Sequence, residues 1–238
     1  IHHPRPIHLV VDGTYFGERK EETSWCVIVA RDPKEKEDLA WLFAETETTY
    51  GYDLLREKLE KLGYVILSVT ADGFSGIKQA FHGLPYQMCQ VHMERLVIKG
   101  TTLNPQTEAG RVLLALTKTL HHTDSETFNQ RLEKYIEKYR DFLNEKTIHP
   151  LTGAWSWTHE GSRFALNALF RHKQYLFTFE QNKNIPKNTN SLEGHFSHVD
   201  DVTGVHRGLS RPHKTKVLNS IFLAGTIAPS KNKLDEIL

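Results

Sequence analysis

The sequence predicts an α/β fold, a mixed sheet with flanking helices, interrupted by an all-helical insertion before the last of three acids. Three strand-like apolar runs lie in the first 45 residues, and helix and strand patterns alternate from there to about residue 90. Helical periodicity then continues to about residue 180. We therefore expect residues 1–95 to form the first part of a core, 96–180 an insertion, and 181–238 the rest of the core.

The core elements follow from apolar spacing and from turn residues. Runs rich in β-branched and aromatic residues predict strands at 7–12, 23–31, 39–45, 64–71 and 86–89. Leucines at helical spacing predict a helix over 50–62 that ends at Gly63, and a short helix over 75–82. Short turns between the first three strands favour an antiparallel meander. This order is that of a ribonuclease-H-like core, in which Asp12 and Asp72 fall on neighbouring strands.

The insertion is expected to be helical throughout. Apolar residues at helical spacing predict helices around 112–120, 128–142 and 160–177. The stretch from Asn182 to Asn190 is the clearest loop, and it leads to a helix that carries Glu193.

Three carboxylates could converge on a pair of divalent metal ions. Asp12 and Asp72 each follow an apolar strand pattern, and Glu193 lies on the later helix. Two metals bridged by carboxylates can activate an attacking oxygen and neutralise a leaving one. Each acid also has an ordinary interpretation, because Asp-Gly is a common turn dipeptide and Asn190 to Glu193 fits a helix start capped by Asn190. The order of all three favours the functional interpretation.

Composition restricts the function class only loosely. The formal net charge is +1, but residues 161–220 hold nine Lys and Arg against four acids, which would suit a phosphate backbone or simply form a solvated surface. No apolar run is long enough to span a bilayer, so the chain is expected to be cytoplasmic, with no membrane partner. Cys26 and Cys89 cannot form a disulfide framework. Because the first residue is Ile1, we expect a fragment whose end-binding module lay upstream.

Five motifs follow one another along nearly the whole chain. They are Val-Val-Asp-Gly-Thr-Tyr (10–15), Thr-Ala-Asp-Gly-Phe-Ser-Gly-Ile-Lys-Gln-Ala-Phe (70–81), Cys-Gln-Val-His (89–92), Trp-Thr-His (157–159) and Thr-Asn-Ser-Leu-Glu-Gly (189–194). In this order they resemble bacterial insertion-sequence transposases of the Mutator-like DDE group. His-Arg-Gly-Leu-Ser (206–210) is similar to a segment that follows the Glu helix in some of those proteins.

The resemblance implies a ribonuclease-H-like catalytic domain that cleaves DNA and transfers strands with two Mg²⁺ or Mn²⁺ ions. Its catalytic and metal-binding triad falls on Asp12, Asp72 and Glu193. It implies a nucleoid-associated protein whose partners are the transposon ends and target DNA, acting as a homodimer in the DNA complex. Cys89 and His92 recur after the second Asp in that family, which implies a supporting role near the site. A half zinc site and a buried structural thiol are the alternatives for this pair.

Six further side chains are candidates for DNA contact. Trp155 and Trp157 lie between helices and could stack on a frayed base, although a loop tryptophan is more often a core anchor. His159 and Arg163 fall one turn apart at a helix start and could face the DNA backbone, or simply be solvated. Arg207 and Arg211 would extend that contact.

Two other functions compete with a transposase. A ribonuclease-H-fold nuclease without strand transfer would share the metals, but it usually lacks a long helical insertion before the last acid. A domesticated, non-catalytic DNA-binding protein is the third possibility, and retention of all three carboxylates argues against it.

Overall fold

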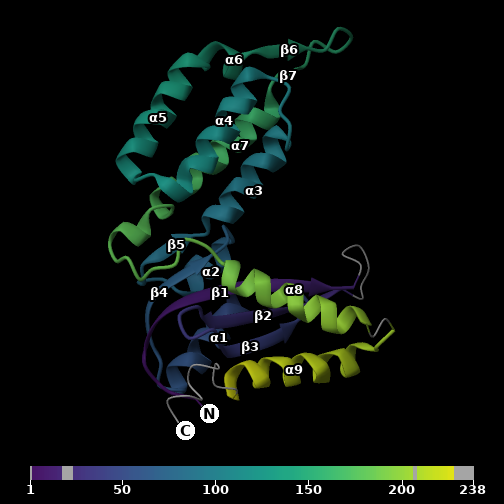
Figure 1. Ribbon diagram of the computed structural model, residues 1–238. Coiled ribbons are helices and arrows are strands. Elements are labelled where there is room, and N and C mark those ends of the chain that lie inside the picture. The colour runs from purple at the N-terminus through teal and green to yellow at the C-terminus, as the bar shows by residue number, and fades with distance from the viewer. Residues whose placement is uncertain (1, 18–23, 206–207, 228–238) are drawn as a thin grey trace. The chain divides into compact units, whose positions relative to one another are not determined.

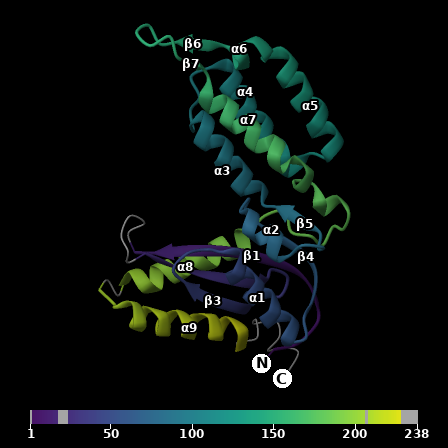
Figure 2. The ribbon, with the colours of Figure 1, turned by 180° about the vertical axis from the view of Figure 1, so that it is seen from behind.

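The computed structural model describes residues 2–17, 24–205 and 208–227. The chain divides into two compact units. The first, here the sheet unit, comprises Ile1–Tyr86 and Asn184–Leu238, and the second, here the helical unit, comprises Gln87–Lys183 (Figures 1 and 2). Among the described helices, none has the length and apolar content needed to cross a bilayer.

A five-stranded mixed sheet is the centre of the sheet unit. Its order is β3-β2-β1-β4-β5. The strands are β1 (Pro6–Phe16), β2 (Trp25–Asp32), β3 (Glu37–Ala44), β4 (Val65–Ala71) and β5 (Tyr86–Met88). β2 pairs antiparallel with both β1 and β3, which confirms the predicted meander, and β1 pairs parallel with β4. Asp12 and Asp72 therefore come from neighbouring strands, as predicted.

Strand β1 is longer than its apolar run. The predicted strand ends at Asp12, whereas β1 continues to Phe16 and pairs Asp12 with Val29 and Gly13 with Ile28. The turn interpretation of Asp12-Gly13 is therefore wrong. The antiparallel partner β2 is buried along its whole length, and it keeps the polar end of β1 in the sheet by backbone pairing.

Within the described part of the sheet unit, four helices accompany the strands. They are α1 (Thr49–Lys61), α2 (Ser75–Ala80), α8 (Asn190–Val205) and α9 (Arg211–Ile227), and the last two lie side by side along the sheet (Figures 1 and 2). Apolar residues from β1 and β2 form one buried cluster with residues from α8 and α9. Its members are Val10, Phe16, Trp25, Val27, Val29, Leu192, Phe196, Val199, Leu218 and Phe222. The second chain segment therefore covers a face of the sheet built by the first.

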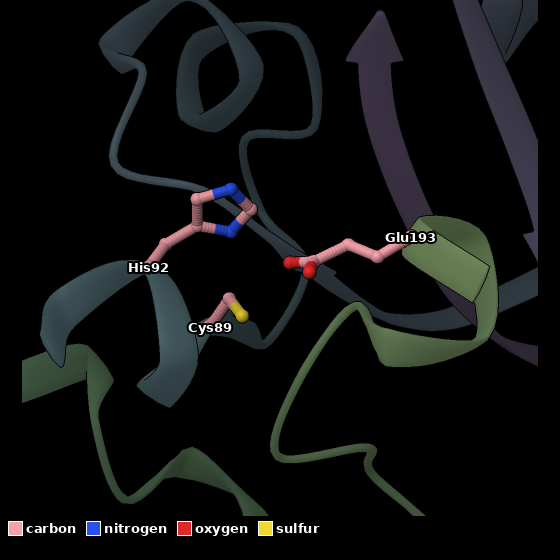
Figure 3. A group of neighbouring side chains, drawn as sticks. All are labelled: Cys89, His92 and Glu193. Atoms are coloured by element: carbon pink, nitrogen blue, oxygen red, sulfur yellow. The ribbon is translucent and has the colours of Figure 1, made fainter. Parts of the chain in front are cut away.

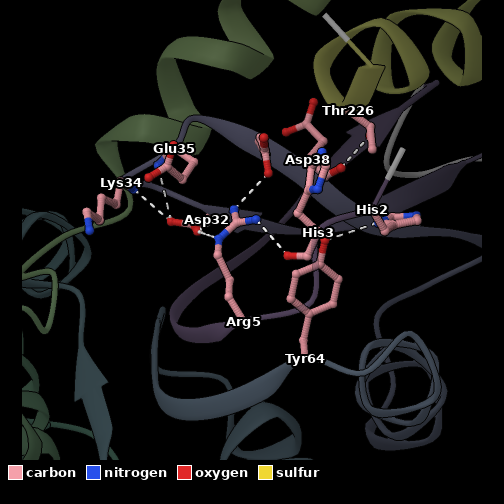
Figure 4. A network of polar contacts seen from close by, with 10 residues as sticks. His2, His3, Arg5, Asp32, Lys34, Glu35, Asp38, Tyr64 and Thr226 are labelled. Atoms are coloured by element: carbon pink, nitrogen blue, oxygen red, sulfur yellow. Dashed lines mark hydrogen bonds and ion pairs between the residues drawn. The ribbon is translucent and has the colours of Figure 1, made fainter. Parts of the chain in front are cut away.

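Polar contacts tie the edges of this unit together (Figure 4). Arg5 donates to Asp32 Oδ2 and Glu37 Oε2, each at 2.7 Å, and so joins the start of β1 to the turn between β2 and β3. Thr226, near the end of α9, donates its hydroxyl to the carbonyl oxygen of Asp38 in β3. These bonds join the sheet to the segment before β1 and to its last helix.

The helical unit contains α3 (Gln90–Thr101), α4 (Glu108–Lys118), α5 (Ser125–Lys138), α6 (Arg140–Asn144) and α7 (Glu160–His172), with short 3-10 turns at Thr119–His122, Lys173–Tyr175 and Thr178–Glu180. The helix predicted over 128–142 is broken at Tyr139, between α5 and α6. The helix predicted over 160–177 ends at His172.

The expectation of an all-helical insertion is wrong for residues 146–157. Strands β6 (Lys146–Ile148) and β7 (Trp155–Trp157) form an antiparallel hairpin that pairs Lys146 with Trp157 and Ile148 with Trp155. Pro150 and Gly153 lie in its loop, where Gly153 has a positive φ of 66° that favours glycine. Strands of three residues are too short to show an alternating pattern.

Two glycines allow helices α3 and α7 to touch. A Cβ atom on either Gly100 or Gly161 would run into the carbonyl oxygen of the other. The helix backbones therefore approach each other more closely than side chains at these two positions would permit.

Candidate active site

Asp12 is the buried member of the predicted triad. It is 9% exposed, and its Oδ1 accepts a hydrogen bond of 2.9 Å from the backbone N–H of Gly13. The pKa of its carboxyl is raised to about 7, mainly by burial and also by the negative charges of Asp72, Glu193 and Glu47, while the hydrogen bond from Gly13 acts in the opposite direction. Asp12 therefore lies in the combined field of three other acids.

Asp72 lies directly after β4 and is half-buried. Its Oδ1 accepts from the backbone N–H of Phe74 at 2.9 Å, which organises the turn into α2. The Tyr86 hydroxyl donates to the Asp72 carbonyl oxygen and so ties this turn to β5. Asp72 therefore forms the local turn and also lies near enough to Asp12 for its charge to raise the pKa of Asp12. The turn interpretation of Asp72 does not exclude a role in the site.

Glu193 lies in the first turn of α8 and is half-buried. The helix begins at Asn190, so the fully buried Thr189, rather than the predicted Asn190, precedes the first turn. Thr189 accepts from the N–H groups of Leu192 at 2.8 Å and Glu193 at 3.1 Å. Its hydroxyl lies 3.4 Å from Glu193 Oε1. Thr189 thus fixes both the start of the helix and the Glu193 side chain.

The structure therefore brings the three predicted acids together from three separate elements. Asp12 comes from the middle of β1, Asp72 from the end of β4, and Glu193 from the start of α8. Sequence reasoning missed the fourth acid, Glu47, which lies in the loop between β3 and α1. A loop Glu beside Glu45 and Thr46 has no sequence signal that separates it from a solvated residue.

Cys89 and His92 belong to the helical unit, at the junction of β5 and α3. Cys89 is buried and directly precedes the helix, and His92 lies in its first turn. Figure 3 draws these two side chains, together with the Glu193 side chain at the start of α8. The two cysteines of the chain, Cys26 and Cys89, are both buried and are not joined by a disulfide. The supporting role implied for Cys89 and His92 stays a prediction.

Trp155 and Trp157 lie on strand β7 of the hairpin. Trp155 is 54% exposed, and Lys146 Nζ lies 4.0 Å from its ring centroid. The Trp157 ring is half-buried under Arg163, whose Cζ is 3.6 Å from the ring centroid. The two rings therefore differ, because Trp155 offers an open surface next to a cation whereas Trp157 anchors the hairpin.

The remaining candidates for DNA contact have internal partners or lie outside the described residues. Arg163 donates to the Leu143 carbonyl oxygen at 2.6 Å, and His159 Nε2 lies 2.8 Å from Glu145 Oε2. Arg211, at the start of α9, pairs with Glu45 at 2.6 Å. Arg207 falls outside the residues that the structure describes.

Comparison with known proteins places this chain in a family. Residues 8–196 match the profile described as Transposase IS66 family, a span that includes all three acids of the triad. No curated protein matches the chain. The profile supports an insertion-sequence transposase, but IS66 is not a Mutator-like family, so the group suggested by the five motifs is not supported. Because the profile covers well over half of the chain, the protein belongs to the IS66 family of transposases.

Proposed function

We propose that this chain is the catalytic part of a DDE transposase, which cleaves DNA and transfers strands with divalent metal ions on a ribonuclease-H-like core. One observation carries the proposal: Asp72 and Glu193 lie close enough to Asp12 for their charges to raise its pKa, although the three residues come from separate elements. The mixed sheet with flanking helices is compatible with such a core.

The donor set suits magnesium or manganese. Carboxylate oxygens are the ligands that hard divalent cations prefer, and Asp12, Asp72 and Glu193 all supply such oxygens. Several like charges around a buried carboxylate are costly unless a cation offsets them. When bound, a pair of such ions would activate the attacking oxygen and stabilise the leaving 3′-oxygen.

Each acid has a part in this proposal. Asp12 is the buried acid of the three, and it would hold the ions together with Asp72 and Glu193. The N–H of Gly13 orients the Asp12 carboxylate, and Phe74 N–H and the Thr189 hydroxyl orient the other two. Because Asp12 has to be ionised to bind metal, its raised pKa makes metal binding sensitive to pH near neutrality.

Side chains other than the three acids would also contact DNA. Trp155 presents an open ring beside Lys146, a combination suited to stacking on an unpaired base next to the phosphate backbone. Arg211, together with Arg207, would contribute positive charge in the sheet unit. We expect the transposon ends and the target to be the substrates, bound by a homodimer.

The test uses a supercoiled plasmid carrying the element's two ends, with Mn²⁺ or Mg²⁺. Asp12→Asn, Asp72→Asn and Glu193→Gln should each abolish cleavage and strand transfer by folded protein. Asp53→Asn, an exposed acid on α1, is the matched control and should retain both activities. Retention of strand transfer by any of the three variants would remove that residue from the triad.

The same assay separates the alternatives. Cleavage without joining by the wild-type chain would favour a nuclease. Metal-independent DNA binding with no cleavage would favour a non-catalytic DNA-binding protein.

A further inference from the structure

Glu47 reaches back from the loop after β3 to strand β1. A Cβ atom placed on Gly13 would lie 2.6 Å from Glu47 Oε1 and 2.8 Å from its Cδ. The carboxylate of Glu47 therefore occupies the space that any side chain at position 13 would need. Gly13 in turn donates its N–H to Asp12 Oδ1 at 2.9 Å. Gly13 therefore contacts the Asp12 carboxylate through its N–H and, because it has no side chain, leaves room for the Glu47 carboxylate.

A buried tyrosine holds this carboxylate in place. Tyr52 on α1 is 0% exposed, and its hydroxyl donates to Glu47 Oε2 at 2.7 Å. The backbone N–H of Glu47 donates to the Tyr15 hydroxyl at 3.2 Å, which links the loop to β1 a second time. A glutamate that only faced solvent would not need a hydrogen bond from a fully buried side chain such as Tyr52. Glu47 is therefore held by hydrogen bonds at both its carboxylate and its backbone N–H.

The electrostatic environment of Tyr52 shows the same grouping. Burial is the main cause that raises the pKa of its hydroxyl, and the charges of Glu47, Asp72 and Asp12 raise it further. One oxygen of Glu47 thus faces the tyrosine, while the other lies beside the backbone that orients Asp12. In the metal-free protein, the negative charge of Glu47 is repelled by the other carboxylates, which is unfavourable. A bound divalent cation would attract these carboxylates, so the charge of Glu47 would then be stabilising.

We propose that Glu47 is a fourth carboxylate of the metal site, which acts on the bound cations through Oε1, directly or through a metal-held water, while Tyr52 holds Oε2. This inference rests on the proposed function. It makes the site a four-acid site, with a net charge that two divalent cations would balance.

Manganese binding by the whole chain tests the inference without DNA. In calorimetry with Mn²⁺ alone, Glu47→Gln should weaken binding at least tenfold, because the amide keeps an oxygen for Tyr52 but carries no charge. Tyr52→Phe should weaken it several-fold, because the carboxylate loses its clamp. The matched control is Glu57→Gln, whose side chain lies on α1, is 55% exposed and pairs with Lys61, and this variant should bind as the wild type does.

Stability separates a metal role from a structural one. The metal-free Glu47→Gln protein should melt at the wild-type temperature or above it, because one of the charges that repel Asp12 is gone. Weaker Mn²⁺ binding by a protein that melts in this way supports the inference. Unchanged Mn²⁺ affinity in Glu47→Gln, while Asp72→Asn loses binding, overturns the inference and leaves the triad intact. Wild-type Mn²⁺ affinity in Asp72→Asn as well, or no binding by the wild type, overturns both proposals.

Discussion

His195 Nε2 lies 2.8 Å from Asp38 Oδ2, a contact that joins helix α8 to strand β3. Asp38 is 0% exposed, and its other carboxylate oxygen pairs with Arg31 of β2. His195 follows Glu193 by two residues on the same helix, so this buried pair fixes the helix that carries the last acid. The position of Glu193 thus depends on a charge cluster that takes no part in the proposed chemistry.

We expect Asp38→Asn to lower the free energy of unfolding by about 3 kcal/mol, because the buried Arg31 guanidinium would lose its counter-charge. Urea unfolding at pH 7 measures the change. Asp53→Asn, at an exposed position, should stay within about 0.5 kcal/mol of the wild type. A loss below about 1 kcal/mol for Asp38→Asn would show that the cluster does not hold α8 in place.

The raised pKa of Asp12 predicts that the metal-free protein loses stability as pH rises. The folded pKa of about 7 exceeds the ordinary value of 3.8, so between these values the folded state keeps a proton that the unfolded chain has released. Unfolding free energy should therefore fall between about pH 4 and pH 7, with a slope that approaches about 1.4 kcal/mol per pH unit.

Asp12→Asn should remove most of this slope and make the metal-free protein more stable than the wild type at pH 8. Denaturant titrations at several pH values, with a chelator present, measure both effects. A wild-type curve that is flat over this range, or a variant that is less stable at pH 8, would contradict the prediction.

The contact between Gly100 and Gly161 predicts a sensitive position in the helical unit. Gly161→Ala should destabilise the protein by about 1 to 3 kcal/mol, because the new Cβ forces α3 and α7 apart. Gly204→Ala is the control, since this glycine of α8 has no atom near its Cβ position, and it should be neutral or slightly stabilising. Thermal unfolding compares the two, and equal melting temperatures would show that the helices can separate at little cost.

Trp155 and Trp157 should respond differently to truncation. Trp155→Ala should leave the melting temperature unchanged and weaken binding to a frayed transposon end by about tenfold, within the range for loss of one stacked base. Trp157→Ala should lower the melting temperature, because Arg163 loses the ring beneath it. Leu151→Ala, which removes an 89% exposed side chain from the same hairpin, is the control for binding. Unchanged end binding by Trp155→Ala would exclude the stacking role.

Elements with long, regular patterns could be predicted from the sequence, whereas features that depend on a partner segment could not. The buried runs of β2 and β4 and the leucines of α1 carry their own periodicity. By contrast, Gly13 to Phe16 are in a strand because β2 pairs with them, and hairpin β6–β7 is held by side chains such as Arg163 from the following helix. Their structure is decided by contacts that no local pattern contains.

The same distinction applies to the site. Asp12, Asp72 and Glu193 stand in motifs, so the sequence could single them out as a group. Glu47 could not be found in this way, because its relation to Asp12 exists only when the loop after β3 returns to β1 over Gly13. Trp155 and Trp157 show a related limit, since their sequence context is nearly the same although one ring is open and the other covered.

The buried cluster between the sheet and helices α8 and α9 has a consequence for synthesis of the protein. Strands β1 and β2 cannot cover their apolar face until Leu218 and Phe222 have been translated. At about 5 to 20 residues per second, roughly 7 to 30 seconds pass between completion of the first segment of the sheet unit and arrival of those residues. Glu193 can reach Asp12 only after α8 has been translated. A nascent chain that stops before α8 would therefore hold an incomplete acid set, and on the proposed function it would be unable to cut DNA.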